Sequence, residues 1–364
     1  MTRSLFDEVS FRCGAVAKNR AALAPLTNGQ SHDDGTLGDD ELAWLARRAA
    51  GGFGLVETCA AHVSPDGKGF DGQLGVWDDK HLEGLSRLAR AVSAEGALGV
   101  VQLYHGGVRC PSRLTGQQPW SASEFREDKA SFEVPRAATE EDLARVIGHF
   151  ADAAERSEKA GFAGVELHGA HGYLLGQFLS SSMNTRDDAW GGAIEGRAGL
   201  VRAVMRAVRA RVSKGFAVGV RLSPEDFGYT RGVDLDETVS VARWLADDGA
   251  DFIHLSLWDA RRTTKKRPAE HPLPLFRAAL PDDVKIIAAG NIWDRADADA
   301  ALALGADLVS VGKAAIVTPD WAREARAEGY VARRGPLTRA EYRERAVSER
   351  FIGYLKRFDN MVAD

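Results

Sequence analysis

Eight short runs of aliphatic residues recur along the chain, and segments with helical spacing separate most of them. Continuous apolar runs of this length are typical of parallel strands that are buried on both faces. Strands that alternate with helices in this way form a parallel sheet. The eight runs are AALAPL (21–26), GLVET (54–58), ALGVVQL (97–103), FAGVELH (162–168), FAVGVRL (216–222), DFIHLSL (251–257), VKIIAAG (284–290) and DLVSVG (307–312).

The segments between the runs support eight β/α units. Residues 139–160 and 197–212 place their aliphatic side chains on one helical face. Several predicted helices end in a glycine just before the next strand, where a left-handed residue turns the chain quickly. These glycines are Gly52, Gly96, Gly161, Gly249 and Gly305. Eight such units predict a closed (β/α)8 barrel, and a doubly wound open sheet is the alternative.

The length of 364 residues suits one α/β barrel, and no Pro- or Ser-rich linker divides the sequence. We therefore interpret residues 1–364 as a single domain. One connection, at about 104–138, is too long for a simple turn and leaves the carboxyl end of a strand, so we expect it to cap the site there. A helical tail is expected at about 338–364.

Composition excludes several classes of protein. A net charge of -5 argues against nucleic acid as a partner. No apolar run is long enough to cross a membrane, and the first residues, MTRSLFDEVSF, lack the apolar core of a signal peptide. Cys13, Cys59 and Cys110 are too widely spaced for a disulfide framework or a CxxC site. We expect a cytoplasmic protein that acts on a small molecule.

Polar residues interrupt the apolar pattern where barrel enzymes carry their chemistry, at the carboxyl ends of the strands. The segment HGAHGY brings His168, His171 and Tyr173 to one such end. A neutral imidazole can donate a hydrogen bond to a carbonyl oxygen, and a phenol can protonate a carbanion or enolate. The alternative is a pair of structural loop histidines with a rim tyrosine. No third ligand is visible for zinc, so no metal is expected.

The last two runs end in AAGN and SVGK, which contain Gly290, Asn291, Gly312 and Lys313. Glycine turns after strands seven and eight of a barrel are typical of phosphate sites, in which backbone N–H groups face the anion. Lys313 would add a positive charge. Ordinary strand-to-helix turns are the alternative.

Gln102 and Arg221 stand at the ends of two other apolar runs. A buried arginine needs a partner, and a ligand that gains negative charge, such as a reduced flavin, would supply one. The alternative is a salt bridge between Arg221 and a barrel carboxylate such as Glu166. Glu57 is interpreted as structural. The basic stretch ARRTTKKR (260–267) is interpreted as a solvated loop, with contact to the phosphates of a nicotinamide cofactor as the alternative.

Taken together, these segments resemble the old yellow enzyme family of NAD(P)H:flavin oxidoreductases, from about residue 5 to the terminal FIGYLKRF. The matching segments are NRAALAPLTN (19–28), GLVETCAAHVSPDGKG (54–69), VQLYHGG (101–107), VELHGAHGYLLGQFLSSSMNTRDDAWGG (165–192), VGVRLSPEDF (218–227) and the AAGN and VGK turns. The string at 165–192 is the most specific of them.

The resemblance implies a TIM barrel with FMN at its mouth, and it implies a role for each candidate residue. Pro25, Thr27 and Ala60 would line the flavin, Gln102 and Arg221 would hold its pyrimidine edge, and Gly290, Asn291, Gly312 and Lys313 would hold its phosphate. His168 and His171 would bind the substrate carbonyl, and Tyr173 would donate a proton. Many relatives have cysteine in place of Thr27 and arginine in place of Lys313, and some have a tyrosine directly after the Thr27 position, where this chain has none.

The function implied is that of an ene-reductase, in which NADPH or NADH reduces FMN and hydride then passes to the β-carbon of an α,β-unsaturated carbonyl. Phenols, which mimic an enolate oxygen, are expected ligands. The alternatives are a quinone or nitro-compound reductase of the same fold, or a flavin-free phosphate-binding lyase or isomerase. The natural substrate, the preferred coenzyme and the oligomeric state are left open, although relatives often form dimers or tetramers.

Overall fold

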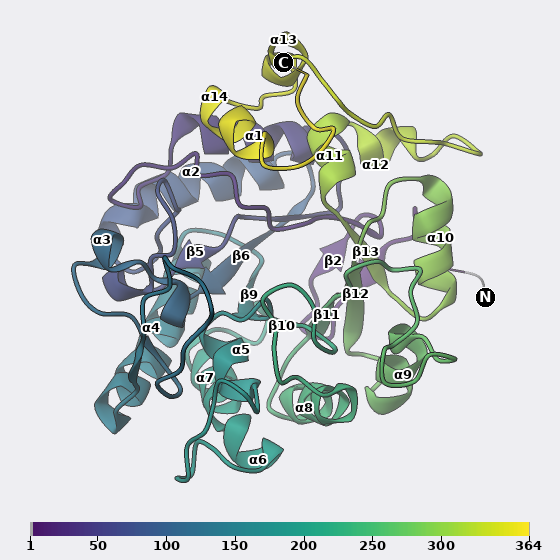
Figure 1. Cartoon of the computed structure of the whole chain (residues 1–364). Coiled ribbons are helices and arrows are strands. Elements are labelled where there is room, and N and C mark those ends of the chain that lie inside the picture. Colours follow the sequence, from purple (N-terminus) through teal and green to yellow (C-terminus); the bar gives the residue numbers. More distant parts are fainter. Residues whose placement is uncertain (1–2, 364) are drawn as a thin grey trace.

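The computed structural model describes residues 3–363, and eight parallel strands close into a barrel at its centre (Figure 1). In order around the barrel they are β3 (Ala21–Leu23), β4 (Leu55–Glu57), β6 (Leu98–Tyr104), β9 (Gly164–Gly169), β10 (Ala217–Leu222), β11 (Phe252–Ser256), β12 (Lys285–Ala289) and β13 (Leu308–Val311). Pairing of β13 with β3 and of β4 with β6 completes the circle. All eight predicted strands are present, and the (β/α)8 prediction is confirmed.

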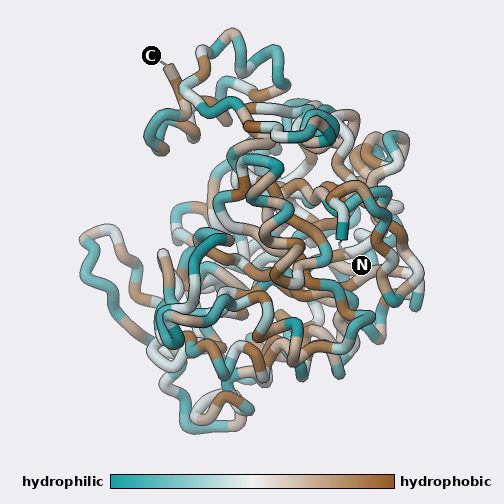
Figure 2. Tube along the Cα trace, turned by 90° about the vertical axis from the view of Figure 1, so that its right-hand side faces the viewer, coloured by the Kyte–Doolittle hydropathy of each residue, from teal (hydrophilic) through white to brown (hydrophobic). Residues whose placement is uncertain are grey.

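Helices cover the outside of the barrel. They are α1 (Asp39–Ala50), α2 (Leu82–Ser93), α4 (Glu140–Lys159), α7 (Gly199–Arg211), α8 (Leu235–Asp247), α9 (Pro272–Ala279), α10 (Arg295–Ala303) and α11 (Lys313–Val317). The start of α4 is fixed by a capping box between Thr139 and Asp142. Hydrophobic stretches gather inside the trace and hydrophilic stretches lie on its outer loops (Figure 2), as burial of the apolar helix faces requires.

Glycines permit two tight features of the barrel. The five glycines predicted to turn helices into strands all have positive φ, for example 99° at Gly52 and 116° at Gly249. Gly219 on β10 has a different role, because a Cβ there would lie 2.2 Å from the ring of Phe252. The aromatic ring therefore occupies the space of a missing side chain on the neighbouring strand.

A short hairpin closes the amino end of the barrel. Its strands, β1 (Val9–Ser10) and β2 (Val16–Ala17), are antiparallel. Val9, Phe11 and Ala17 pack in one buried cluster with inward-facing strand residues, and the ring of Phe11 lies 5.8 Å from that of Phe252. The barrel interior is thus filled at this end, and its carboxyl end is the face left for a site.

The long connection after β6 folds over the carboxyl end. It contains η3 (Gly107–Arg109), α3 (Ser112–Thr115) and the paired strands β7 (Trp120–Ser121) and β8 (Arg136–Ala137). Trp120 is only 2% exposed, and its indole N–H donates to Asp66 at 3.1 Å. Smaller elements elsewhere are β5 (Ala61–His62), η1 (Pro65–Gly67), η2 (Asp79–His81), α5 (Leu174–Leu179), α6 (Ile194–Arg197) and α12 (Trp321–Glu324).

The carboxyl-terminal tail returns to the barrel. Its helices are α13 (Arg339–Glu344) and α14 (Glu349–Leu355), which lie beside α1 and α11 in Figure 1. The ring of Phe351 meets that of Trp44 on α1 at 5.0 Å, and Ser348 bonds Gln30 in the loop after β3. The tail therefore borders the mouth. Within residues 3–363, no helix is both long and apolar enough to span a bilayer.

Candidate active site

Strand β9 and the turn after it bring the three HGAHGY side chains together. His168 lies in the strand, and His171 and Gly172 adopt positive φ values of 59° and 71°, which reverse the chain before α5. The ring of His168 lies 5.0 Å from that of His171 and 4.8 Å from that of Tyr173. The strained turn at His171 is what aims the second imidazole back over the barrel.

The hydrogen bonds of the two histidines define which nitrogens carry protons. His168 Nδ1 accepts from the N–H of Ala170 at 3.3 Å, so we assign its proton to Nε2. Ser256 Oγ accepts from Arg221 at 3.3 Å and lies 2.6 Å from His171 Nε2. Because arginine only donates, the single hydroxyl hydrogen of Ser256 is free to point at His171. When the Ser256 hydroxyl donates to His171 Nε2, the proton of His171 is on Nδ1, and this is the tautomer that we adopt.

His171 Nδ1 and His168 Nε2 lie 3.3 Å apart, within hydrogen-bond distance of each other. With a proton on both nitrogens the pair has no acceptor of its own, so both can donate only to an acceptor atom placed beside them. Burial lowers the pKa of each imidazole well below its usual value, with further lowering by His171 and Arg221 at His168 and by Arg221 at His171. Both rings are thus neutral at neutral pH. Two such N–H groups are suited to a carbonyl or enolate oxygen.

Tyr173 stands beside this pair as a protonated phenol. Its ring lies 4.5 Å from that of Tyr104 on β6. Burial, with smaller contributions from Tyr354 and other groups, raises the pKa of Tyr173 to about 12. The phenol therefore keeps its proton at neutral pH and can lose it only to a strong base, such as a carbanion that forms next to it.

A layer of polar side chains fills the barrel directly beneath the histidines. Glu166 on β9 accepts from Gln102 Nε2 at 2.7 Å and pairs with His254 Nδ1 at 2.6 Å. Burial alone would raise the pKa of Glu166, but His254, Arg221 and Gln102 outweigh it and the pKa is lowered. Glu57 on β4 has both carboxyl oxygens buried without a hydrogen bond, and burial next to Glu166 raises its pKa well above the usual value.

Arg221 is the permanent cation of this layer. It is 7% exposed, and its Nε is buried without a hydrogen-bond partner. Glu166 and Glu57 attract its charge, but the hydrogen bonds of Glu166 go to Gln102 and His254. The alternative of a simple Arg221–Glu166 salt bridge therefore does not describe the contact. Glu57, Glu166 and His254 have oxygen and nitrogen atoms near enough to ligate a metal, but a guanidinium beside them opposes a second cation.

The loop after β3 and the end of β4 form another side of the mouth. Pro25 and Thr27 are partly exposed there, and Ala60 is buried. A cavity of about 200 Å³ lies between Thr27, Lys313 and apolar residues of the tail. Burial raises the pKa of the Tyr354 phenol, and its hydrogen bond with Thr27 opposes the rise. The tail thus places a tyrosine against Thr27, although no tyrosine follows Thr27 in the sequence.

The predicted phosphate residues follow the neighbouring strands β12 and β13, and β13 pairs in turn with β3, which precedes the Thr27 loop. Gly290 and Asn291 have positive φ values of 157° and 51°. The side-chain amide of Asn291 donates to Asp259 and accepts from the indole N–H of Trp293, at 3.0 Å each. Helix α11 begins at Lys313 after Gly312, and the N–H of Ala315 in its first turn donates to Gly312 O at 2.9 Å. Lys313 is exposed.

Sequence reasoning missed three aromatic residues of the site and one contact. Ser256 is a polar residue at a strand end, which the sequence indicates, but nothing in the sequence indicated its contact with His171. Phe227 follows β10 and Trp258 follows β11, and their rings continue outward from His171 at 6.2 Å and then 5.9 Å. Their aromatic character was the only available signal. Tyr354 gave a weaker signal, through the helical spacing of Phe351, Tyr354 and Phe358.

Comparison with known proteins places this geometry among flavin enzymes. The sequence model of the NADH:flavin oxidoreductase / NADH oxidase family matches residues 4–330. The chain is 38% identical over 325 residues to a probable NADH-dependent flavin oxidoreductase of Bacillus subtilis, with 88% of this chain and 87% of the relative covered. It is 36% identical to the NADH:acrylate oxidoreductase of Vibrio harveyi, over 88% of this chain but only 33% of that longer protein. The solved old yellow enzyme homologue of Zymomonas mobilis superposes with a TM-score of 0.81 at 29% identity, covering 93% of this chain and 96% of that one.

Proposed function

Because the chain belongs to the NADH:flavin oxidoreductase / NADH oxidase family, the old yellow enzymes, we propose that it is an ene-reductase that adds a hydride and a proton across the double bond of an α,β-unsaturated carbonyl compound. Family membership makes it an oxidoreductase that uses FMN with NADH or NADPH, and it sets aside a flavin-free lyase or isomerase. The observation that carries the finer proposal is the convergence of two neutral imidazole donors beside a protonated phenol.

The residues at the mouth fit FMN. The buried Nε of Arg221 without a partner suits a polar edge that gains negative charge. Thr27, Ala60 and Gln102 lie on the same side of the mouth and would line or bond the ring system, with Pro25 beside them. Next to the loop after β3, the backbone N–H groups of Lys313 and Ala314 at the start of α11 and the exposed charge of Lys313 would suit a phosphate. Gly290, Asn291 and Gly312 would complete that cradle.

Bound FMN would supply the chemistry of hydride acceptance from the coenzyme and hydride donation to the alkene. The residues of this chain polarise and protonate the substrate. His168 and His171 hold the carbonyl oxygen and stabilise the negative charge that develops on it as the β-carbon gains hydride. Tyr173 then gives its proton to the α-carbon and recovers it from solvent. In the polar layer beneath, Glu166 and Glu57 attract the charge of Arg221, which in turn donates to Ser256.

Two further facts support an alkene as the substrate. The name of the Vibrio harveyi relative specifies acrylate, a conjugated unsaturated acid. A reaction on a quinone needs no proton donor aimed at carbon, whereas the phenol of Tyr173 stands next to the oxygen site, where the α-carbon of an enone would lie. The geometry therefore favours alkene reduction over quinone or nitro-compound reduction.

An isotope experiment tests the proposal. Cyclohexenone should be reduced to cyclohexanone with deuterium at the α-carbon when the reaction runs in D₂O, and at the β-carbon when the coenzyme carries deuterium at its hydride position. Mass spectrometry and NMR of the product distinguish the two carbons. A parallel assay with a quinone gives the competing rate. If the yellow, FMN-loaded protein oxidised the coenzyme with a quinone but left cyclohexenone intact, the ene-reductase proposal would be wrong.

A further inference from the structure

A second cavity opens beside the histidine pair and has no assigned ligand. Its volume is about 640 Å³, which is in the range of small-molecule sites. We call it the Trp258 cavity. It lies between the loop after β10 and the loop after β11, and its lining includes Phe227, Ser256, Trp258, Asp259, Arg262 and Lys265. Ser256 also bonds His171, so the cavity is adjacent to the proposed substrate site.

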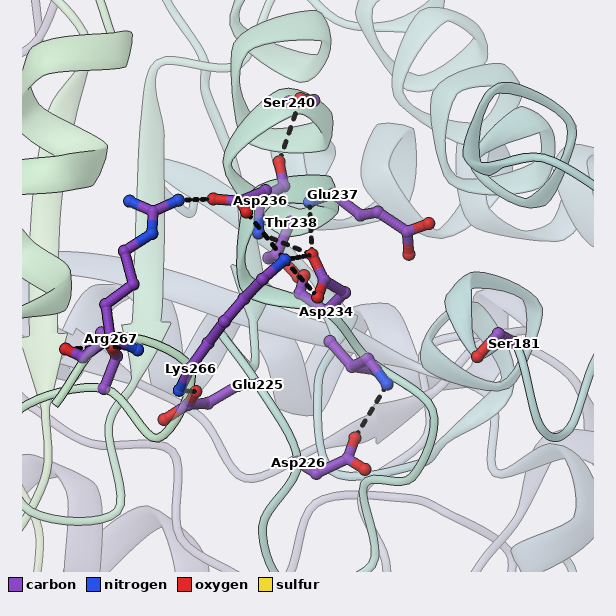
Figure 3. Close-up of polar contacts among 12 residues, drawn as sticks. Ser181, Glu225, Asp226, Asp234, Asp236, Glu237, Thr238, Ser240, Lys266 and Arg267 are labelled. Carbon is purple, nitrogen blue, oxygen red and sulfur yellow. Dashed lines mark hydrogen bonds and ion pairs between the residues drawn. The ribbon is translucent and has the colours of Figure 1, made fainter.

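Most of the basic stretch next to this cavity is already neutralised. Lys266 bridges Asp234 and Asp236 at the start of α8, and Arg267 pairs with Asp236 (Figure 3). Arg261 pairs with Asp259 at 3.0 Å, and the ammonium group of Lys265 donates to the carbonyl of Asp226. The earlier interpretation of residues 260–267 as a solvated loop therefore needs refinement, because the loop is held by specific ion pairs.

Arg262 is the exception in this stretch. It is exposed, and the one hydrogen bond that involves it in the described part of the chain is made by its backbone N–H. Its guanidinium faces no carboxylate there, although Asp259 lies three residues away and is taken by Arg261 and Asn291. A free guanidinium on the wall of a cavity is suited to a phosphate oxygen, which it can bind with two parallel hydrogen bonds.

Trp258 provides a flat apolar surface at the same place. Its side chain is 65% exposed, an unusual state for so large an apolar group. One side of it is supported by Phe227, whose ring lies 5.9 Å away. An indole held in this way can stack on a planar base, and such stacking tolerates any base because each has a π-face.

From these features we propose that the Trp258 cavity holds the adenosine diphosphate half of the nicotinamide coenzyme, with adenine on Trp258 and the diphosphate beside Arg262. The nicotinamide end would then extend past Ser256 toward the histidines. This inference rests on the proposed function only in its use of the coenzyme, and it assigns a site to the part of the coenzyme that does not react.

The charges of the cavity also favour NADH over NADPH. Three cations line it, Arg261, Arg262 and Lys265, and so do three carboxylates, of Glu225, Asp226 and Asp259. A 2′-phosphate would add up to two negative charges to a site with no surplus positive charge. The acidic side chains are instead suited to accept hydrogen bonds from the ribose hydroxyls.

ADP-ribose is the probe that tests this site, because it lacks the reactive ring. Calorimetric titration of the FMN-loaded protein should give saturable binding. Trp258→Ala should raise the dissociation constant about tenfold, which is within the range of base–aromatic stacking. Arg262→Gln should raise it about fivefold and should reduce the weakening caused by added salt. Tyr229→Ala is the matched control, since Tyr229 is another exposed aromatic residue of the mouth, at 62%, that does not line the cavity.

Several outcomes would overturn the inference. ADP-ribose that does not bind, or that binds Trp258→Ala as tightly as the unchanged protein, removes the coenzyme from this cavity. Equal losses in Tyr229→Ala would show a general effect on the mouth. If the two variants instead weakened only a bulky carboxylated enone, the cavity would belong to the substrate. Tighter binding of 2′-phospho-ADP-ribose would contradict the preference for NADH.

The proposed function is checked separately in the same samples. Flavin reduced with dithionite needs no coenzyme, so the unchanged protein treated in this way should still reduce cyclohexenone. Loss of enone reduction in the unchanged protein would count against the ene-reductase proposal, whereas the ADP-ribose titration would still decide the coenzyme site.

Discussion

Ser256 Oγ lies 2.6 Å from His171 Nε2, and the same oxygen accepts a hydrogen bond from Arg221 at 3.3 Å. Through these two contacts, Ser256 connects the guanidinium of Arg221 to the His171 ring, whose proton is on the opposite nitrogen, Nδ1. Because Arg221 cannot accept, it orients the hydroxyl, and the hydroxyl in turn holds the His171 proton on the nitrogen that faces His168.

Removal of the hydroxyl should therefore weaken substrate binding without removing either histidine. For Ser256→Ala we expect the dissociation constant of a phenol, measured by difference absorbance or calorimetry, to rise about threefold to tenfold, as for one net hydrogen bond. Ser256→Thr keeps the hydroxyl on a strand that favours β-branched residues, so it should bind phenol nearly normally. Equal weakening by both variants would show that packing, rather than the hydroxyl, matters at this position.

Tyr173→Phe removes the proposed proton donor and keeps the edge-to-face contact of the ring with Tyr104. Alkene reduction should slow by roughly 10²–10⁴, the usual range for general-acid catalysis, while anaerobic reduction of the flavin by NADH stays close to normal. Stopped-flow absorbance separates the two rates. Since the pKa of Tyr173 is about 12, the alkene rate of the unchanged protein should show no loss from phenol ionisation between pH 7 and about 10. A variant that reduces cyclohexenone at full rate would remove Tyr173 from this role.

Two buried histidines away from the site should limit stability in acid. Burial lowers the pKa of His62 and of His81 to about 4. The unfolded chain therefore takes up more protons below pH 6.5, and the stability present above that pH is lost as pH falls toward 4. For His62, the effect should be at most roughly 2–3 kcal/mol. Denaturant unfolding of His62→Gln across this range should give a shallower pH dependence, whereas His32→Gln, at an exposed position, should match the unchanged protein.

The two glutamates of the polar layer should respond in opposite ways to the same substitution. The raised pKa of Glu57 means that its contribution is favourable at low pH and is lost as pH rises through the folded value. Glu57→Gln has no carboxyl group to ionise and should avoid this loss of stability. Above pH 7, the unfolding free energy of the variant should therefore equal or exceed that of the unchanged protein. Glu166→Gln takes a charge partner from Arg221 and a hydrogen-bond partner from His254, whose pKa burial lowers, and should cost about 3–5 kcal/mol. Equal destabilisation by both would mean that Glu57 is ionised.

The barrel could be predicted from sequence because its signal is local. Buried parallel strands are nearly continuous apolar runs, and each glycine turn marks the start of the next unit. The same alternation placed Gln102, His168 and Arg221 at strand ends. Contacts between elements that are far apart in the sequence could not be predicted from it. Ser256 and His171 are 85 residues apart, and Tyr354 meets Thr27 only because the tail folds back over the mouth.

The sequence also could not show which buried groups pair with one another. Glu166 was considered as a partner for Arg221, yet its hydrogen bonds go to Gln102 and His254. Three strands contribute to that arrangement, and the register between them decides it. In the same way, the basic stretch gave no sign that the start of α8 pairs with Lys266 and Arg267 and that Arg262 is left exposed.

The hairpin of β1 and β2 determines from which end ligands can enter the barrel. With Phe11 seated against Phe252, the barrel has a floor. Coenzyme, alkene, product and the water that re-protonates the phenol therefore all enter or leave at the carboxyl end of the barrel. If the coenzyme and the alkene both need the space beneath the histidines, they cannot bind together, and the oxidised coenzyme must leave before the alkene binds.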